Sequence, residues 1–89
     1  MIPDDILKRI NEETDIVQLV SEFVSLEKRG KNYFGLCPFH QEDTPSFSVS
    51  PDKKIAKCMG CGEGGNPINF YRKIKNISFS QAAYELGER

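Results

Sequence analysis

The chain has 89 residues, of which 38% are hydrophobic and 28% charged, a composition typical of one small folded domain and not of a disordered chain. Its net charge of −1 indicates no polyanion partner by itself, and no run approaches the about 20 apolar residues of a membrane span. The N-terminus lacks a signal peptide's apolar run, and three cysteines is an odd count, so we expect a cytoplasmic protein without a disulfide framework.

The first segment, residues 3–25, is predicted to be helical. Pro3 suits the first position of a helix, and Asp4 and Asp5 suit the positive end of its dipole. Thr14 or Asp15 can cap a second helix. The apolar face of that second helix is predicted to comprise Ile16, Leu19, Val20, Phe23 and Val24.

The next segment, residues 26–62, is predicted to form short antiparallel strands. Residues 46–50, SFSVS, alternate serines with Phe47 and Val49, which is the pattern of a half-exposed strand. NYFGL (32–36) and KKIAK (53–57) are predicted to be strands as well, and we expect Phe34 and Leu36 to be core residues. Turns are predicted at 28–32 and 50–52.

The last segment, residues 66–88, is predicted to be helical again. Asn66 can cap one helix, with Pro67 at its first position, and the capping-box pattern of residues 78–81 begins another. Gly87 can end that final helix. The apolar positions of the two helices are Ile68, Phe70, Tyr71 and Ile74, and then Ala82, Ala83 and Leu86.

Two ligand pairs predict a metal site. Cys37 and His40 are separated by two residues, as are Cys58 and Cys61, and 17 residues lie between the pairs. That layout matches a tetrahedral zinc site with histidine in one cysteine position. An iron–sulfur cluster would normally require four cysteines, and buried unliganded thiols are the remaining alternative. We predict one structural Zn²⁺ held by these four residues, which would stabilise a domain too small to bury a large core.

The stretch His40-Gln41-Glu42 also imitates the H-x-E of zinc deaminases, in which the glutamate shuttles protons. Cys37 argues against this reading, because a fourth protein ligand closes the position that a catalytic water needs. Glu42 is most simply a solvated carboxylate in a loop. We therefore predict no catalytic residue in this chain.

The charges are unevenly distributed. Residues 1–27 have a net charge of −5, residues 28–57 of +3 and residues 58–89 of +1. A sheet with cations, hydroxyls and rings suits single-stranded nucleic acid, whereas an acidic helical N-terminus suits docking to a protein. Both readings stay open from the residues alone. The candidate nucleic-acid contacts are Lys28, Arg29, Lys31, Tyr33, Ser46, Ser48, Lys53, Lys54 and Lys57.

Two runs carry a resemblance to a known family. KRGKNYFGLCPFHQEDTPSFSVSPDK (28–53) and CMGCGEGGNPINF (58–70) closely resemble the N-terminal zinc-binding domain of bacterial DNA primases, and the flanking helices fit as well. The sequence departs from the family pattern at Met59 and Ala56, where rings are common, and at Asp43, where a lysine is frequent.

The resemblance implies an α+β fold, a zinc ribbon whose small antiparallel sheet is flanked by helices, over residues 1–89. It implies that the domain is a fragment of a longer primase and helps to recognise the single-stranded DNA template during RNA primer synthesis in DNA replication. It further implies a separate catalytic domain as partner, in the same chain or a neighbouring one, and a replicative helicase bound through other regions. An alternative is a zinc-ribbon docking module that regulates a partner catalytic domain.

Overall fold

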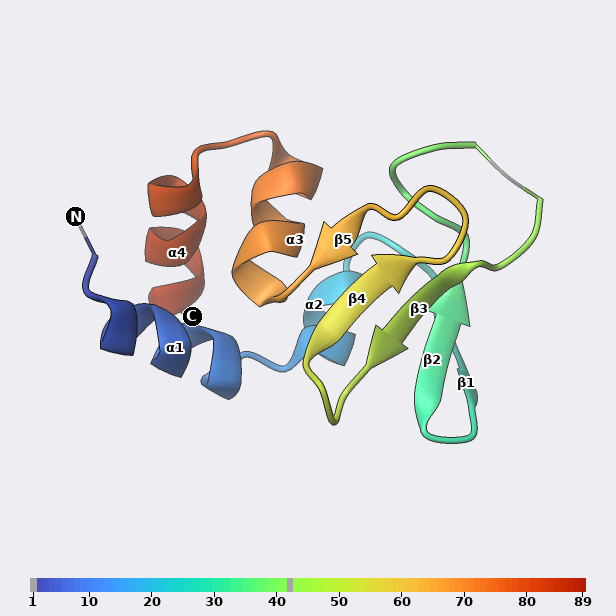
Figure 1. Cartoon of the computed structure of the whole chain (residues 1–89), viewed down its shortest axis with the longest axis horizontal. Helices are drawn as coiled ribbons and strands as arrows, with labels where there is room; N and C mark the ends of the chain where they lie inside the picture. The colour runs from blue at the N-terminus through green and yellow to red at the C-terminus, as the bar shows by residue number, and fades with distance from the viewer. Residues whose placement is uncertain (1, 42) are drawn as a thin grey trace.

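A five-stranded antiparallel sheet and four helices make up the computed structural model, which describes residues 2–41 and 43–89 (Figure 1). This α+β arrangement confirms the predicted fold class. The elements in chain order are α1 (Asp4–Glu13), α2 (Ile16–Ser21), β1 (Glu27–Arg29), β2 (Asn32–Gly35), β3 (Phe47–Ser50), β4 (Ile55–Cys58), β5 (Gly64–Gly65), α3 (Pro67–Lys75) and α4 (Phe79–Gly87).

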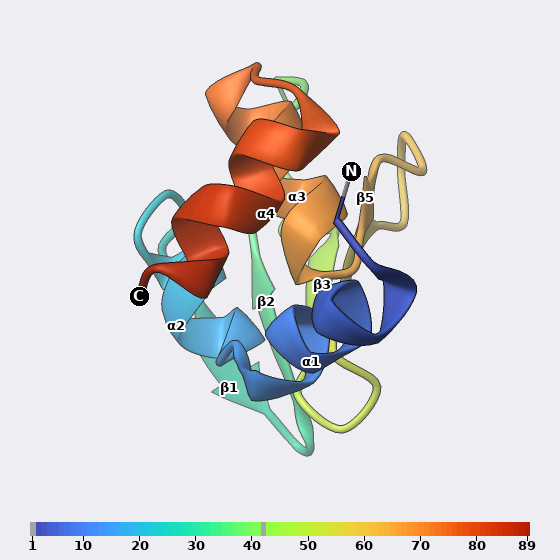
Figure 2. The ribbon, with the colours of Figure 1, turned by 90° about the vertical axis from the view of Figure 1, so that its left-hand side faces the viewer.

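The sheet has the strand order β1-β2-β3-β4-β5 and two different faces. Phe47 pairs with Cys58 and Val49 with Ala56, and all four side chains are buried on what we call the core face. Helices α2 and α3 pack on this face, and α4 packs on α3 and α1 (Figures 1 and 2). Because side chains alternate along a strand, the residues between these four point to the opposite side, the outer face.

Side-chain caps begin three of the helices, as the sequence predicts. Asp15 accepts a hydrogen bond from the Gln18 N–H at 3.1 Å, so Asp15 caps α2 in preference to Thr14. Asn66 and Ser78 cap α3 and α4 in the same way. Pro3 differs from its predicted place by one residue, since it is the cap of α1 and not the first helical position.

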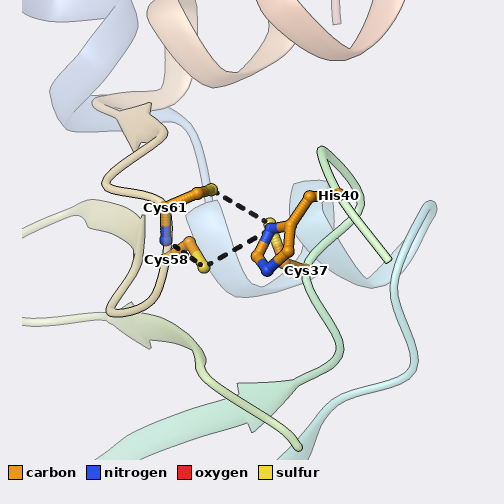
Figure 3. A group of neighbouring side chains, drawn as sticks. All are labelled: Cys37, His40, Cys58 and Cys61. Carbon is orange, nitrogen blue, oxygen red and sulfur yellow. Dashed lines mark hydrogen bonds between the residues drawn. The ribbon is translucent and has the colours of Figure 1, made fainter. Parts of the chain in front are cut away.

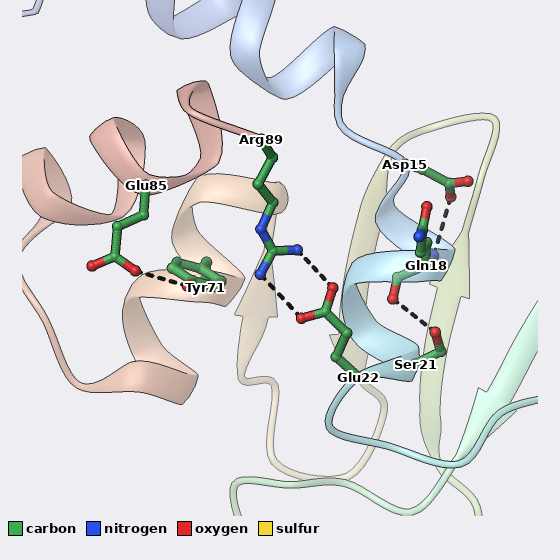
Figure 4. Close-up of polar contacts among 7 residues, drawn as sticks. All are labelled: Asp15, Gln18, Ser21, Glu22, Tyr71, Glu85 and Arg89. Carbon is green, nitrogen blue, oxygen red and sulfur yellow. Dashed lines mark hydrogen bonds and ion pairs between the residues drawn. The ribbon is translucent and has the colours of Figure 1, made fainter.

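A polar cluster joins the end of α4 to the end of α2 (Figure 4). The two terminal nitrogens of Arg89 donate to the two carboxylate oxygens of Glu22, at 2.6 and 3.0 Å. The guanidinium also lies 5.4 Å from the centre of the Tyr71 ring, and the Tyr71 hydroxyl donates to Glu85 at 2.8 Å. These contacts join α2, α3 and α4 to one another.

Gly64 in β5 lies against the backbone of β4 and should not tolerate a side chain. Its φ is +135°, and a Cβ there would lie 2.0 Å from the Ala56 carbonyl oxygen. Gly64→Ala is therefore expected to destabilise the zinc-loaded protein by roughly 1–3 kcal/mol in urea unfolding. Gly62→Ala is the matched control: its φ is +79° but its Cβ would meet open space, so only about 1 kcal/mol is expected. Equal costs for the two variants would contradict the proposed clash.

No helix in residues 2–41 or 43–89 has the length and apolar character needed to cross a bilayer.

Candidate metal centre

The four predicted ligands meet at one end of the sheet. Cys37 lies two residues beyond the end of β2, and Cys58 is the last residue of β4. The turns that follow these strands bring His40 and Cys61 to the same place (Figure 3). Within residues 2–41 and 43–89 this is the one group of His, Cys, Asp or Glu side chains found close enough together to hold a metal ion.

The distances between the ligand atoms fit a tetrahedral zinc ion. All four atoms lie within 4.8 Å of one another, with 3.7 Å between the sulfurs of Cys37 and Cys61 and 4.0 Å between the Cys58 sulfur and the His40 Nδ1. Two thiolates at about 2.3 Å from a tetrahedral zinc lie about 3.8 Å apart. Three thiolates and an imidazole suit zinc and not hard, oxygen-seeking cations. The four residues are thus positioned to bind one zinc ion.

Backbone N–H groups point at two of the sulfurs. The Gly60 and Cys61 amides each lie 3.3 Å from the Cys58 sulfur, and the Phe39 amide lies 3.4 Å from the Cys37 sulfur. The turn after β4 supports this geometry through Gly62, whose φ of +79° is left-handed. Such donors stabilise thiolates, which are the form that binds a metal.

The Ser46 hydroxyl also faces the metal site, 3.6 Å from the Cys58 sulfur. Ser46 was a candidate for contact with nucleic acid. It contacts the sulfur of a buried ligand, which the sequence did not indicate, and its contact with nucleic acid stays a prediction.

The pKa values of the two buried cysteines move in opposite directions. Burial tends to raise the pKa of Cys58, but the amides of Cys61 and Gly60 and the Ser46 hydroxyl outweigh it, and the pKa falls to about 6. Burial raises the pKa of Cys37 to about 12, and its hydrogen bonds with Cys58 and Cys61 act in the same direction. Zinc binding requires both thiols to be deprotonated.

Phe39, between Cys37 and His40, anchors the first ligand pair in the core. Its ring makes edge-on contacts with Phe47 and Phe70, with centroid distances of 6.0 and 5.9 Å. This role could not be predicted from the sequence, because a ring in a turn is equally consistent with an exposed position. The packing makes the position of the zinc ligands depend on the hydrophobic core.

Comparisons with known proteins agree with this geometry. A family model described as CHC2 zinc finger matches residues 2–89. The chain belongs to the CHC2 zinc finger family. It is 58% identical over 88 residues to a DNA primase of Staphylococcus aureus and 56% identical to one of Staphylococcus epidermidis. Each alignment covers 99% of this chain, and the chain spans 15% of the length of those primases.

A solved structure of a primase from Aquifex aeolicus, containing zinc-binding and RNA polymerase domains, matches this CHC2 zinc finger with a TM-score of 0.88 and 50% sequence identity. The match covers 94% of this chain and 21% of the Aquifex chain. The resemblance to the zinc-binding domain of bacterial primases therefore holds in both sequence and fold. Glu42 lies outside the residues that the structure describes, so its predicted place in the loop stays a prediction.

The candidate nucleic-acid residues do not all lie on the same face of the sheet. Ser48 pairs with Phe34 and with Lys57, so these three share the outer face. Tyr33 pairs with Val49, and Lys28 pairs with Tyr33. Tyr33 and Lys28 therefore lie on the core-face side, at the edge of the sheet. Tyr33 is not brought to the serine face, and Phe34 takes that place.

The remaining candidates lie near the hairpin turns, at the end of the sheet away from the zinc ligands (Figure 1). Arg29, Lys31 and Lys53 are exposed there. Lys54 is half-buried, and its ammonium donates to the Thr14 carbonyl oxygen at 3.3 Å, so it has a structural partner.

The prediction that Leu36 is a core residue is wrong, because 51% of it is exposed.

Proposed function

We propose that this chain is the template-recognition module of a bacterial DNA primase and binds single-stranded DNA to help initiate RNA primer synthesis. The observation that carries the proposal is the 58% identity over 88 residues to proteins named DNA primase, together with an assembled Cys-His-Cys-Cys site. The zinc serves as a structural ion in this proposal, since four protein ligands leave no position for a reacting water.

The proposed domain comprises residues 1–89, with helices in 3–25, a zinc ribbon in 26–62 and helices in 66–88. We propose that it is part of a longer primase whose polymerase chemistry belongs to another domain. The Aquifex relative, with zinc-binding and RNA polymerase domains in one chain, supports that organisation. A catalytic domain in the same or a neighbouring chain, and a replicative helicase bound elsewhere, are the proposed partners.

The charge of the outer face supports a nucleic-acid ligand. Arg29 and Lys57 lie on this face, and Lys31 and Lys53 lie in the turns at its end. The Glu27 carboxylate forms an ion pair with the Arg29 guanidinium at 3.8 Å, and Asp52 is the acidic residue in the turn between β3 and β4. Four cations against two acids give a surface that attracts phosphates, although the whole chain is slightly acidic.

Titration of a labelled single-stranded oligonucleotide with the zinc-loaded protein tests the proposal. We expect weak binding whose affinity falls as salt rises from about 50 to about 200 mM, with the log–log slope reduced by about 0.7 when one phosphate-contacting cation is removed. Lys53→Ala and Lys57→Ala should each reduce the slope. Lys8→Ala, on the exposed side of α1, is the matched control and should not. Absence of binding at low salt, or equal slopes in all four proteins, would reject this role.

A second candidate function, docking to a protein, rests on a cleft of about 530 Å³ between α1, α2 and the end of α4. Its apolar lining includes Ile6, Ile10 and Leu19, and Glu13 and Asp15 stand beside them. A primase catalytic domain that docks here should shift the NMR signals of these residues. Single-stranded DNA should shift those of the outer face, so the two ligands can be mapped separately.

A further inference from the structure

Ser46 lies where the sheet meets the metal site, and both of its backbone groups are hydrogen-bonded. The residue comes directly before β3, and its N–H donates to the Thr44 carbonyl oxygen at 2.8 Å. Its carbonyl oxygen accepts a hydrogen bond from the Met59 N–H, also at 2.8 Å, which continues the pairing of β3 and β4 by one residue. These two bonds hold Ser46 in place beside the end of β4, where Cys58 lies.

The Ser46 side chain lies against the metal ligands. Its Oγ is 3.6 Å from the Cys58 sulfur. A Cβ at position 60, where the chain has glycine, would lie 3.5 Å from that Oγ, 3.6 Å from the Cys58 sulfur and 3.7 Å from His40 Cε1. The hydroxyl, the sulfur and the imidazole therefore surround one small space beside the Gly60 backbone. Because a metal-bound thiolate carries no proton, the hydroxyl must be the donor in its contact with the sulfur.

The two cysteines of the second ligand pair differ in their need for such a donor. Cys58 is 0% exposed, whereas Cys61 is exposed and can accept hydrogen bonds from water. A buried thiolate depends on donors from the protein, because burial of a charge is costly unless the charge is hydrogen-bonded. The Gly60 and Cys61 amides supply two donors to the Cys58 sulfur at 3.3 Å, and Ser46 supplies a third from another part of the chain.

We infer that Ser46 is a positioning residue for the zinc ion, whose hydroxyl donates to the Cys58 thiolate and thereby makes the site hold the metal more tightly. The inference goes beyond the proposed function, since it concerns the metal site alone and does not depend on DNA binding. The two amide donors are backbone groups and need no particular side chain. The hydroxyl does need one, because serine and threonine are the residues that carry a hydroxyl on Cβ.

The experiment measures the zinc affinity of Ser46→Ala and Ser46→Thr, and the absorption spectrum of each variant with cobalt in place of zinc. Loss of a partner that hydrogen-bonds a metal ligand costs about 10–100-fold in metal affinity, so Ser46→Ala should bind zinc about 10-fold more weakly in competition with a chelator. The sulfur lone pairs also rise in energy, so the thiolate-to-cobalt charge-transfer band should move to longer wavelength. Ser46→Thr keeps the hydroxyl and should retain both the affinity and the band.

Ser48→Ala is the matched control, because Ser48 pairs with Lys57 on the outer face, opposite to the face that buries Cys58. Its zinc affinity and cobalt band should equal those of the original protein, and a thermal melt of each zinc-loaded variant verifies that its fold is kept. The inference is overturned if Ser46→Ala binds zinc as tightly as the original protein. It is also overturned if the affinity falls without movement of the band, as a purely structural loss would produce, or if the band of Ser46→Thr matches that of Ser46→Ala.

Discussion

Replacing Cys58 with serine is expected to abolish cooperative folding of this domain at room temperature. Cys58 is fully buried, and its sulfur accepts hydrogen bonds from two amides as well as serving as a metal ligand. Structural zinc contributes about 10–16 kcal/mol of apparent binding free energy in zinc-finger peptides, which equals or exceeds the about 5–15 kcal/mol stability of ordinary domains. Circular dichroism melts of the purified variant measure the loss of cooperative folding, and a zinc assay measures the loss of the bound metal.

Chelation should act in the same direction on the unchanged chain. Excess chelator is expected to remove the cooperative melting transition, and one equivalent of zinc should restore it. Met59→Ser is the matched control, since Met59 is in the same turn but is 74% exposed and offers no strong ligand. It should keep one zinc ion and melt within a few degrees of the original protein. A Cys58→Ser variant that kept both zinc and its melting temperature would show that the site does not stabilise the fold.

The metal site could be predicted from the sequence because its signal is local and chemically distinctive. Each ligand pair needs only a tight turn, and thiolates and imidazole are few in the chain. Helix starts at Asp15, Asn66 and Ser78 were equally local, since a cap bonds to an amide three residues further on. In these places the nearest neighbours in sequence decide the structure.

The outer face could not be predicted so well, because strand register is not local. Tyr33 and Phe34 are adjacent rings, and a shift of one residue exchanges their faces. The pairing of Tyr33 with Val49 decides which of the two rings lies on the outer face. This register cannot be predicted from residues 32–36 alone. β5 was missed for a related reason: it consists of Gly64 and Gly65, which carry no side-chain pattern.

Phe39 shows how the site depends on parts of the chain that sequence motifs do not mark. Its neighbours Phe47 and Phe70 come from β3 and α3, which follow it by 8 and 31 residues. Ligand spacing therefore predicts which atoms bind zinc. The hydrophobic core holds the first ligand pair in its observed orientation.

Phe70→Ala should be the most destabilising change outside the ligands. Phe70 is 0% exposed, and its ring lies about 6 Å from each of the rings of Phe23, Phe39 and Phe47, at 6.1, 5.9 and 5.9 Å. Truncation of a buried phenylalanine costs about 3–5 kcal/mol, because it removes buried area and leaves a cavity. For a domain of this size that corresponds to a melting temperature lower by roughly 15–30 °C.

The same substitution should weaken zinc binding, because the metal binds the folded chain and because Phe70 contacts the ring that lies between two of the ligands. Phe39 loses one of its two ring contacts, so the turn that carries Cys37 and His40 becomes less ordered before the metal binds. Competition with a zinc chelator should show lower affinity for Phe70→Ala and unchanged affinity for Phe79→Ala, a control on the partly exposed side of α4. Unchanged zinc affinity in a strongly destabilised Phe70→Ala would show that the core and the metal site are independent. We expect them to be coupled, because one ring connects the helices, the sheet and the first ligand pair.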